Sequence, residues 1–272
     1  MRDINFIKMH GLGNDFVVFD ARTASIEFDD QMVRAIANRH TGVGCDQLVI
    51  LEPARSPEAD LFMRIHNADG SEVVACGNAT RCVAAKVMDD NASDQATIET
   101  RAGLLTIKRT GTGFTVNMGK AFDDWKDIPL AWNADTLHLE LSEGVLSDPV
   151  GVNIGNPHLV FFVDKLANVP LANLGPKFEH NPLFPEGTNV EVVQVISYDR
   201  LKIRVWERGV GITQACGTGA CAALVASHRR GFTGRQAQVE LEGGSLEIVW
   251  QEDNKVLMTG PASISFTGTW HL

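Results

Sequence analysis

Two of the five cysteines in the 272-residue chain stand in matching surroundings, and a thiol is a group that can move protons. Cys76 and Cys216 each lie inside an Ala-Cys-Gly triplet. Residues 61–77 and 201–217, which end on these triplets, align without a gap, and both contain a strand-like alternation of apolar and polar side chains. A duplicated unit would place the two thiols at equivalent positions.

The segments around each cysteine predict the same order of elements twice. A second match joins Asn14 to Asn156, each preceded by glycine and followed by an apolar segment. After each triplet comes a run of small and apolar residues, 78–88 and 218–228, with the composition of a helix buried nearly all round. Short alternating segments follow in both halves. The pattern predicts an α+β fold of two pseudosymmetric lobes.

The two cysteines would then lie at the first turn of each helix. The first N–H groups of a helix have no partner within it and carry about half a positive charge, so they bind anions and favour a thiolate. Glycine after each cysteine allows a ligand to approach the backbone closely. A substrate carboxylate between the two helix ends would receive N–H groups from Gly77, Asn78, Gly217 and Thr218.

A thiol and a thiolate on opposite sides of one carbon can invert that carbon. The α-proton of an amino acid is a very weak acid, so its removal requires donors that stabilise the developing enolate in a site poor in water. One sulfur would take the proton from one face, and the other would deliver a proton to the opposite face. Nucleophilic thiol chemistry would need only one cysteine with its own base. The pair therefore favours a racemase or an epimerase.

Composition and charge exclude other classes of protein. With 24 Lys and Arg against 34 Asp and Glu, the net charge is −10, which disfavours a nucleic-acid partner. The N-terminus lacks the apolar segment of a signal peptide, and no stretch approaches the roughly 20 apolar residues of a membrane helix, so a cytoplasmic protein is expected. Five cysteines without a CxxC pair suggest reduced thiols and no zinc site. No motif for a cofactor is evident, and we expect neither a cofactor nor a metal.

The chain closely resembles the diaminopimelate epimerases, cofactor-independent enzymes that interconvert LL- and meso-diaminopimelate. The resemblance spans nearly the whole chain, and five segments carry it in order at characteristic spacings. These segments are HGLGNDF (10–16), NADGSE with ACGNATRC (67–82), NPH (156–158), TNVE (188–191) and ERGVG with ACGTGAC (207–221).

The resemblance implies a role for each matched position. Cys76 and Cys216 match the catalytic thiols, while His158 and Glu207 match the residues that assist them. Glu207 would also face the distal ammonium of the substrate. The remaining positions match substrate ligands: Asn14, Asn67, Asn156, Asn189 and Arg208 at the distal end, Gly77, Asn78, Gly217 and Thr218 at the reacting carboxylate, and Gln47 in the lining of the same cleft.

The resemblance also implies the architecture. Each lobe would be a curled, mostly antiparallel sheet around a central helix, and the last strand, near 263–268, would return to the first lobe. The expected lobes are 1–118 with 263–272, and 119–262. Enzymes of this kind act on a small molecule in the synthesis of lysine and peptidoglycan precursors. A homodimer is compatible with the resemblance, although the residues do not fix the oligomeric state.

Two rival functions share this architecture. Proline and hydroxyproline racemases resemble the chain in fold and in dithiol chemistry but lack the distal set, so Arg208, Asn67 and Asn189 argue against them. A relative that moves a proton with a carboxylate and no cysteines is the other alternative. Three positions depart from the usual pattern of the epimerases, and none of them removes a matched catalytic group: His66, Ile212 and Cys45.

Overall fold

The computed structural model describes residues 3–24, 26–74 and 76–271. Ala75 of the first triplet lies outside the described residues, as do positions 1–2 and 272 of the expected first lobe. The chain divides into two compact units, Met1–Val116 with Gly260–Leu272, and Asn117–Thr259. No helix among the described residues is long and apolar enough to cross a membrane.

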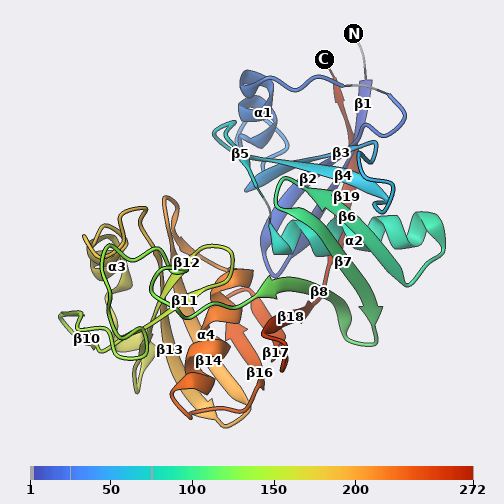
Figure 1. The fold of residues 1–272 in the computed structure, drawn as a ribbon. Helices are drawn as coiled ribbons and strands as arrows, with labels where there is room; N and C mark the ends of the chain where they lie inside the picture. The colour runs from blue at the N-terminus through green and yellow to red at the C-terminus, as the bar shows by residue number, and fades with distance from the viewer. Residues whose placement is uncertain (1–2, 25, 75, 272) are drawn as a thin grey trace. The chain divides into compact units, whose positions relative to one another are not determined.

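The first unit is a sheet with two helices (Figure 1). Strand β2 pairs in parallel with β3, and β4 with β6, whereas the neighbours β1–β2, β3–β4, β4–β5, β6–β7 and β7–β8 are antiparallel. The last strand of the chain, β19, adds an antiparallel edge on β1. The elements are β1 (Asp3–Gly11), β2 (Asn14–Asp20), α1 (Asp30–Ala37), β3 (Gln47–Glu52), β4 (Leu61–Asn67), β5 (Glu72–Val73), α2 (Gly77–Asn91), β6 (Gln95–Thr100), β7 (Gly103–Thr110), β8 (Gly113–Lys120) and β19 (Ser263–His271).

After a two-stranded hairpin, the second unit repeats this order. Here β12–β13 and β14–β16 are parallel, while β11–β12, β13–β14, β14–β15, β16–β17 and β17–β18 are antiparallel. Its elements are β9 (Ser142–Glu143), β10 (Leu146–Ser147), β11 (Val150–Asn153), β12 (Pro157–Phe162), a 3-10 turn (Leu166–Asn168), α3 (Leu171–Glu179), β13 (Asn189–Ser197), β14 (Arg200–Glu207), β15 (Gly211–Thr213), α4 (Gly217–Arg229), β16 (Gln236–Leu241), β17 (Gly244–Trp250) and β18 (Lys255–Gly260). The predicted α+β fold of two pseudosymmetric lobes is thereby confirmed.

Each sheet curls around one buried helix. Helix α2 contacts β1, β6 and β7, and α4 contacts β11–β14, β16 and β17 (Figure 1). In α4, nearly every residue from Gly219 to Ser227 is fully buried. Small side chains make this enclosure possible, because alanine, glycine and cysteine let strands approach the helix from several sides.

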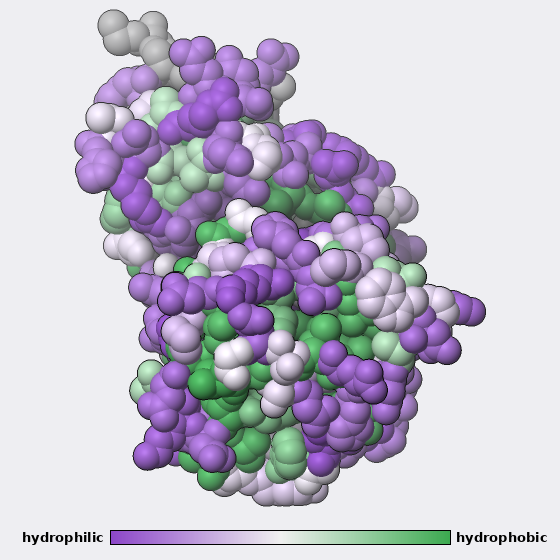
Figure 2. Space-filling model, turned by 90° about the vertical axis from the view of Figure 1, so that its left-hand side faces the viewer, coloured by the Kyte–Doolittle hydropathy of each residue, from purple (hydrophilic) through white to green (hydrophobic). Residues whose placement is uncertain are grey.

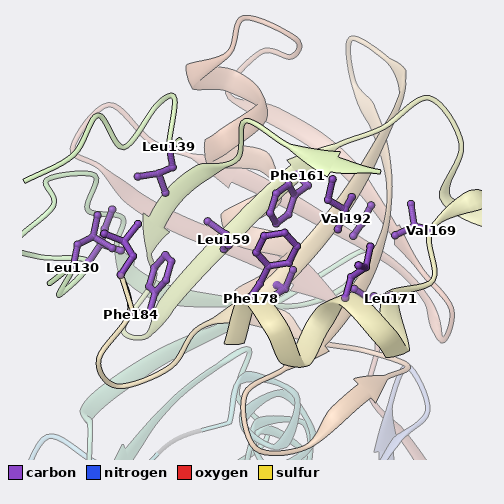
Figure 3. Close-up of a cluster of buried hydrophobic side chains, with 14 of the residues drawn as sticks. Leu130, Leu139, Leu159, Phe161, Val169, Leu171, Phe178, Phe184 and Val192 are labelled. Atoms are coloured by element: carbon purple, nitrogen blue, oxygen red, sulfur yellow. The ribbon is translucent and has the colours of Figure 1, made fainter. Parts of the chain in front are cut away.

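The other face of each sheet carries a second, amphipathic helix that the sequence reading missed. In the second unit, Leu159 and Phe161 of β12 point to this face and pack against α3, where Phe161 and Phe178 have ring centroids 4.5 Å apart (Figure 3). In the first unit, Val33 and Ile36 of α1 pack in the same way. Both helices have only 8 or 9 residues, which is why their periodicity was hard to see in the sequence.

The surface exposes both hydrophilic and apolar side chains. Figure 2 shows hydrophilic side chains over much of one face of the molecule, with apolar groups between them. On the buried face of each sheet, by contrast, polar residues are unusual. Those that point toward the central helices make up the candidate site.

Candidate active site

In the second unit, the predicted residues gather on one face of the sheet. His158 pairs with Asn189 across the parallel strands β12 and β13, so their side chains lie on the same face. Glu191 lies two residues after Asn189, and its partner Val205 lies two residues before Glu207. A period of two thus brings all four polar side chains to the face that meets α4, opposite the apolar cluster on α3.

Cys216 is the N-cap of α4, as the sequence predicts. Its Sγ accepts the N–H of Gly219 at 3.4 Å and lies 3.6 Å from Oγ1 of Thr218. Gly217 and Thr218, the predicted carboxylate ligands, are the first two residues of the helix. The start of α4 therefore combines a thiol with the backbone N–H groups of a helix N-terminus.

The expected preference for a thiolate at Cys216 is wrong. Burial raises the pKa of this thiol well above its usual range, and the carboxylates of Glu207 and Glu191 raise it further. The N–H of Gly219 and the hydroxyl of Thr218 lower the pKa but do not compensate. The sequence reading counted the helix end but not the negative charges that Glu207 and Glu191 bring from neighbouring strands. The neutral thiol is therefore the favoured form of Cys216.

Glu207 lies at the end of β14, beside the thiol. Its carboxylate accepts a hydrogen bond from the Thr213 hydroxyl, and the nearby Cys216 thiol lowers the pKa of the carboxyl group. Burial raises the pKa of Glu207, and the charge of Glu191 acts in the same direction. Thr213 belongs to the short strand β15, which pairs with the end of β14 and brings the hydroxyl to the carboxylate. Glu207 is positioned to exchange a proton with Cys216.

His158 lies fully buried between two oxygen atoms. Its Nδ1 is 2.8 Å from Oε1 of Glu191, and its Nε2 is 2.9 Å from Oδ1 of Asn156. The side chains of His158 and Glu191 both have 0% exposure. The predicted ligand Asn156 is therefore in contact with the predicted assisting histidine.

The side chain of Asn189 is hydrogen-bonded to the backbone of Arg208. The side-chain amide of Asn189 donates to the Pro157 carbonyl at 3.0 Å and accepts the N–H of Arg208 at 2.9 Å. The Arg208 guanidinium donates to the Glu186 carbonyl at 2.8 Å. Asn189 thus fixes the chain where Arg208 leaves β14, and the described residues give the guanidinium no carboxylate partner.

In the first unit, Cys76 is the N-cap of α2. Its Sγ accepts the N–H of Ala79 at 3.5 Å, which repeats the geometry of Cys216 and Gly219. The side-chain oxygen of Asn14 lies 3.9 Å from this sulfur and accepts a hydrogen bond from the Asn78 amide at 3.1 Å. Gly77 and Asn78 are the first two residues of α2. Four predicted residues therefore meet at this helix end.

Gln47 and Asn67 face each other on β3 and β4. The Gln47 amide donates to Oδ1 of Asn67 at 3.1 Å, and the Asn67 amide donates to the Ser71 hydroxyl at 3.1 Å. Oε1 of Gln47 is buried and has no hydrogen-bond partner among the described residues. An acceptor left in this way is suited to a donor on a ligand. Gln47 pairs with Phe16, two residues after Asn14, so these polar residues share one sheet face.

The sequence reading assigned no role to two charged residues that support these groups. Glu191 was noted only as part of the TNVE segment, and Asp46 was not considered. Asp46 accepts hydrogen bonds from the Asn14 amide at 2.9 Å and from Arg39 at 2.6 Å. The sequence did offer a signal for Glu191: it is a carboxylate within an apolar segment, two residues after the predicted ligand Asn189. Asp46 is exposed and separated from Asn14 by a helix, so nothing in the sequence pointed to it.

Comparison with known proteins identifies the family. The family model for diaminopimelate epimerase matches residues 6–122 and 150–265. The chain belongs to the diaminopimelate epimerase family. A diaminopimelate epimerase from Rhodospirillum centenum is 57% identical over 264 residues, covering 97% of this chain and 91% of the relative. One from Erythrobacter litoralis is 51% identical over 268 residues, covering 98% of this chain and 97% of the relative.

Solved structures extend the likeness of fold beyond the diaminopimelate epimerase family. A hydroxyproline epimerase from Agrobacterium vitis, with trans-4-hydroxy-L-proline bound, has a TM-score of 0.70 at 15% identity and covers 98% of this chain and 92% of its own. At that identity the likeness concerns the fold alone. Within residues 3–24, 26–74 and 76–271, no three His, Cys, Asp or Glu side chains are grouped as metal ligands.

Proposed function

We propose that the chain is an isomerase that epimerises LL-diaminopimelate to meso-diaminopimelate without a cofactor, for the synthesis of lysine and peptidoglycan precursors. The observation that carries the proposal is the repeated helix cap: Cys76 and Cys216 each accept the N–H of the third helical residue. Membership of the diaminopimelate epimerase family supports the substrate, because the relatives that are 57% and 51% identical bear that name.

The two thiols would act from opposite faces of the α-carbon. One sulfur, as a thiolate, takes the α-proton and becomes a thiol, and the other thiol gives its proton to the opposite face and becomes a thiolate. The number of protons on the pair is unchanged, and the carbon is inverted. The backbone N–H groups at the starts of α2 and α4 would stabilise charge on the carboxylate while the enolate forms.

The assisting and binding roles belong to the same proposal. Because the charges of Glu207 and Cys216 act on each other, Glu207 would take the proton of that thiol when the substrate needs a thiolate. His158 would assist as the second titrating side chain. The substrate ligands would be Asn14, Gln47, Asn67, Asn156, Asn189 and Arg208 at the distal end and in the cleft lining, and Gly77, Asn78, Gly217 and Thr218 at the reacting carboxylate.

Three further expectations, on lobe bounds, location and oligomeric state, remain predictions. The lobes would be 1–118 with 263–272, and 119–262. A cytoplasmic location and a homodimer are expected of the enzyme. None of these is needed for the chemistry at the α-carbon.

The rival functions are not favoured. The hydroxyproline epimerase matches at 15% identity, against 57% and 51% for the two diaminopimelate epimerases. Arg208, with a guanidinium suited to a second carboxylate, fits a substrate that has two amino-acid ends. The presence of both helix-capping cysteines argues against a cysteine-independent isomerase.

One experiment tests the proposal directly. Purified protein is incubated with LL-diaminopimelate in heavy water, without added cofactor, and deuterium at the α-carbon is followed by NMR together with formation of the meso isomer. We expect both signals to grow with time. Absence of exchange into diaminopimelate, or exchange into L-proline instead, would reject the assigned substrate.

A further inference from the structure

The second unit contains a buried carboxylate, Glu191, to which the mechanism above gives no task. Its side chain has 0% exposure, and its Oε1 lies 2.8 Å from Nδ1 of His158. Its Oε2 is buried and has no hydrogen-bond partner among the described residues. Burying a carboxylate costs free energy unless its charge is paired or hydrogen-bonded.

We propose that Glu191 is a positioning residue, which holds the proton of His158 on Nδ1 and thereby makes Nε2 the titrating atom of that ring. The inference deepens the proposed epimerase function and rests on it. A carboxylate can only accept a hydrogen bond, so the ring nitrogen that faces it must carry the proton. The remaining nitrogen, Nε2, lies 2.9 Å from the side-chain amide of Asn156, one of the proposed substrate ligands. With the proton on Nδ1, this amide must be turned so that its NH2 group, and not its oxygen, faces Nε2.

The duplicated fold provides an internal comparison for this pair. In the first unit, Phe16 pairs with Gln47 across parallel strands, as His158 pairs with Asn189 in the second. Two residues after Gln47 stands Val49, at the place that Glu191 occupies after Asn189. Phe16 and Val49 both have 0% exposure. The fold is therefore satisfied by an apolar pair at these positions, and the ionisable pair in the second unit is not required for packing.

The third residue of the central helix also differs between the two units. The third residue of α2 is Ala79, and the third residue of α4 is Gly219. Both donate their N–H to the capping sulfur. A Cβ added to Gly219 would lie 2.9 Å from Oε1 of Glu191, closer than real Cβ atoms approach other atoms. The same Cβ would lie 3.3 Å from Sγ of Cys216. Glycine at this position therefore leaves room for the carboxylate, whereas the first unit combines Ala79 with Val49.

The charged and titratable groups around Glu191 come from three elements. His158 lies on β12, Glu207 lies at the end of β14, and Cys216 caps α4. The negative charge of Glu191 raises the pKa of both Glu207 and Cys216. Glu191 thus acts on all three proposed catalytic side chains of this unit through charge or a hydrogen bond, without being a proton carrier itself.

The first arm of the test observes the histidine ring without any substrate. Protein with 15N-labelled histidine is compared with the double variant Glu191→Val, Gly219→Ala, which copies the packing of the first unit. The His158 signal is assigned by its loss in His158→Phe. We expect the neutral Nδ1–H tautomer in the wild type and a population with the proton on Nε2 in the double variant. The same tautomer in both proteins would overturn the proposal.

The second arm measures turnover in Glu191→Gln, in Gly219→Ala and in the double variant. We expect kcat to fall at least about tenfold in each, as when a residue that orients a catalytic histidine is lost, with KM within about twofold of the wild type. Glu252→Gln, a change of the same charge on a side chain that is 89% exposed, serves as the control. Wild-type kcat in a folded double variant, or wild-type kcat in Glu191→Gln together with a changed His158 tautomer, would also overturn the proposal.

The two arms separate this inference from the proposed function. If wild-type protein does not act on diaminopimelate, the assigned reaction fails, yet the tautomer comparison still decides the role of Glu191. If the wild type is active and the tautomer does not respond, only the inference about Glu191 fails. Should the double variant not fold, Glu191→Gln provides both readouts, because glutamine keeps the volume and can face Nδ1 with either its oxygen or its NH2 group.

Discussion

The side-chain amide nitrogen of Asn14 donates to Oδ2 of Asp46 at 2.9 Å, and this contact decides which end of the amide faces Cys76. Because a carboxylate only accepts, the NH2 group of Asn14 must point to Asp46 and its oxygen to the thiol. Arg39 holds Asp46 in place from the other side at 2.6 Å. The orientation of a proposed substrate ligand thus depends on an exposed ion pair.

Replacing Asp46 with alanine should therefore weaken substrate binding more than catalysis. Without the carboxylate the amide of Asn14 can turn over, and a hydrogen bond of about 1 kcal/mol to the substrate is lost in part of the molecules. We expect KM to rise about fivefold with little change in kcat, measured by steady-state epimerisation. Asp94→Ala, on a side chain that is 88% exposed, is the matched control. An unchanged KM would mean that Asn14 is held by other contacts.

Loss of either capping thiol should stop epimerisation. Cys76→Ala and Cys216→Ala each remove one of the two proposed acid-base groups, so kcat should fall by roughly 10²- to 10⁴-fold or more. The fully buried Cys82, six residues after Cys76 in the same helix, is the control, and Cys82→Ala should remain active. Isomer formation and deuterium uptake in heavy water are both measured. Full turnover by either capping-site variant would contradict the two-base mechanism.

Cys216 should react slowly with alkylating agents until the pH is high. Its pKa is raised by burial and by Glu207 and Glu191, whereas an ordinary thiol has a pKa of about 8.5. The neutral thiol favours the folded state below the unfolded pKa, and this contribution is lost as pH rises toward the folded value. Iodoacetamide labelling of the Cys216 peptide, followed by mass spectrometry from pH 7 to 10, measures the effect.

In the same experiment, Glu207→Gln should shift the labelling profile of Cys216 to lower pH, because a negative charge beside the thiol is removed. Cys221 is also fully buried and reports on unfolding. A profile for Cys216 centred at the pKa of an ordinary thiol in the folded wild type would contradict the structure.

Asp15 should stabilise the fold through Lys8. Lys8 is 7% exposed and donates to Asp15 and to the Gly44 carbonyl. Burial raises the pKa of Asp15, but hydrogen bonds from Arg39 and Lys8 outweigh this and lower it to about 2. The lowered folded pKa means that the contribution of about 2 kcal/mol is complete above pH 4 and is lost as pH falls toward 2.

Asp15→Asn should therefore lower the free energy of unfolding by about 3 kcal/mol at pH 7, because it leaves a buried ammonium without its counter-ion. The difference from wild type should shrink as the pH falls below 4. Urea unfolding at several pH values measures both effects. Asp253→Asn, an exposed change of the same charge, is the control and should have little effect. Equal stability of Asp15→Asn and wild type would contradict the pairing.

Local patterns in the sequence determined much of this protein. The repeated Ala-Cys-Gly triplets, the alternating segments and the runs of small residues predicted the two-lobe α+β fold and placed both cysteines at helix starts. These predictions succeeded because caps, periodicity and composition are set by residues near one another in the chain. The short helices α1 and α3 escaped because 8 or 9 residues carry little periodicity.

Only the tertiary structure decided how the polar residues act on one another. Glu191 meets His158 because β12 and β13 pair in parallel across the intervening helix α3, and Asp46 meets Asn14 across α1. The pKa of Cys216 is raised where the helix end alone would lower it, because burial and two carboxylates come from separate strands. Desolvation and charge depend on what packs around a group, and that information is spread over the whole unit.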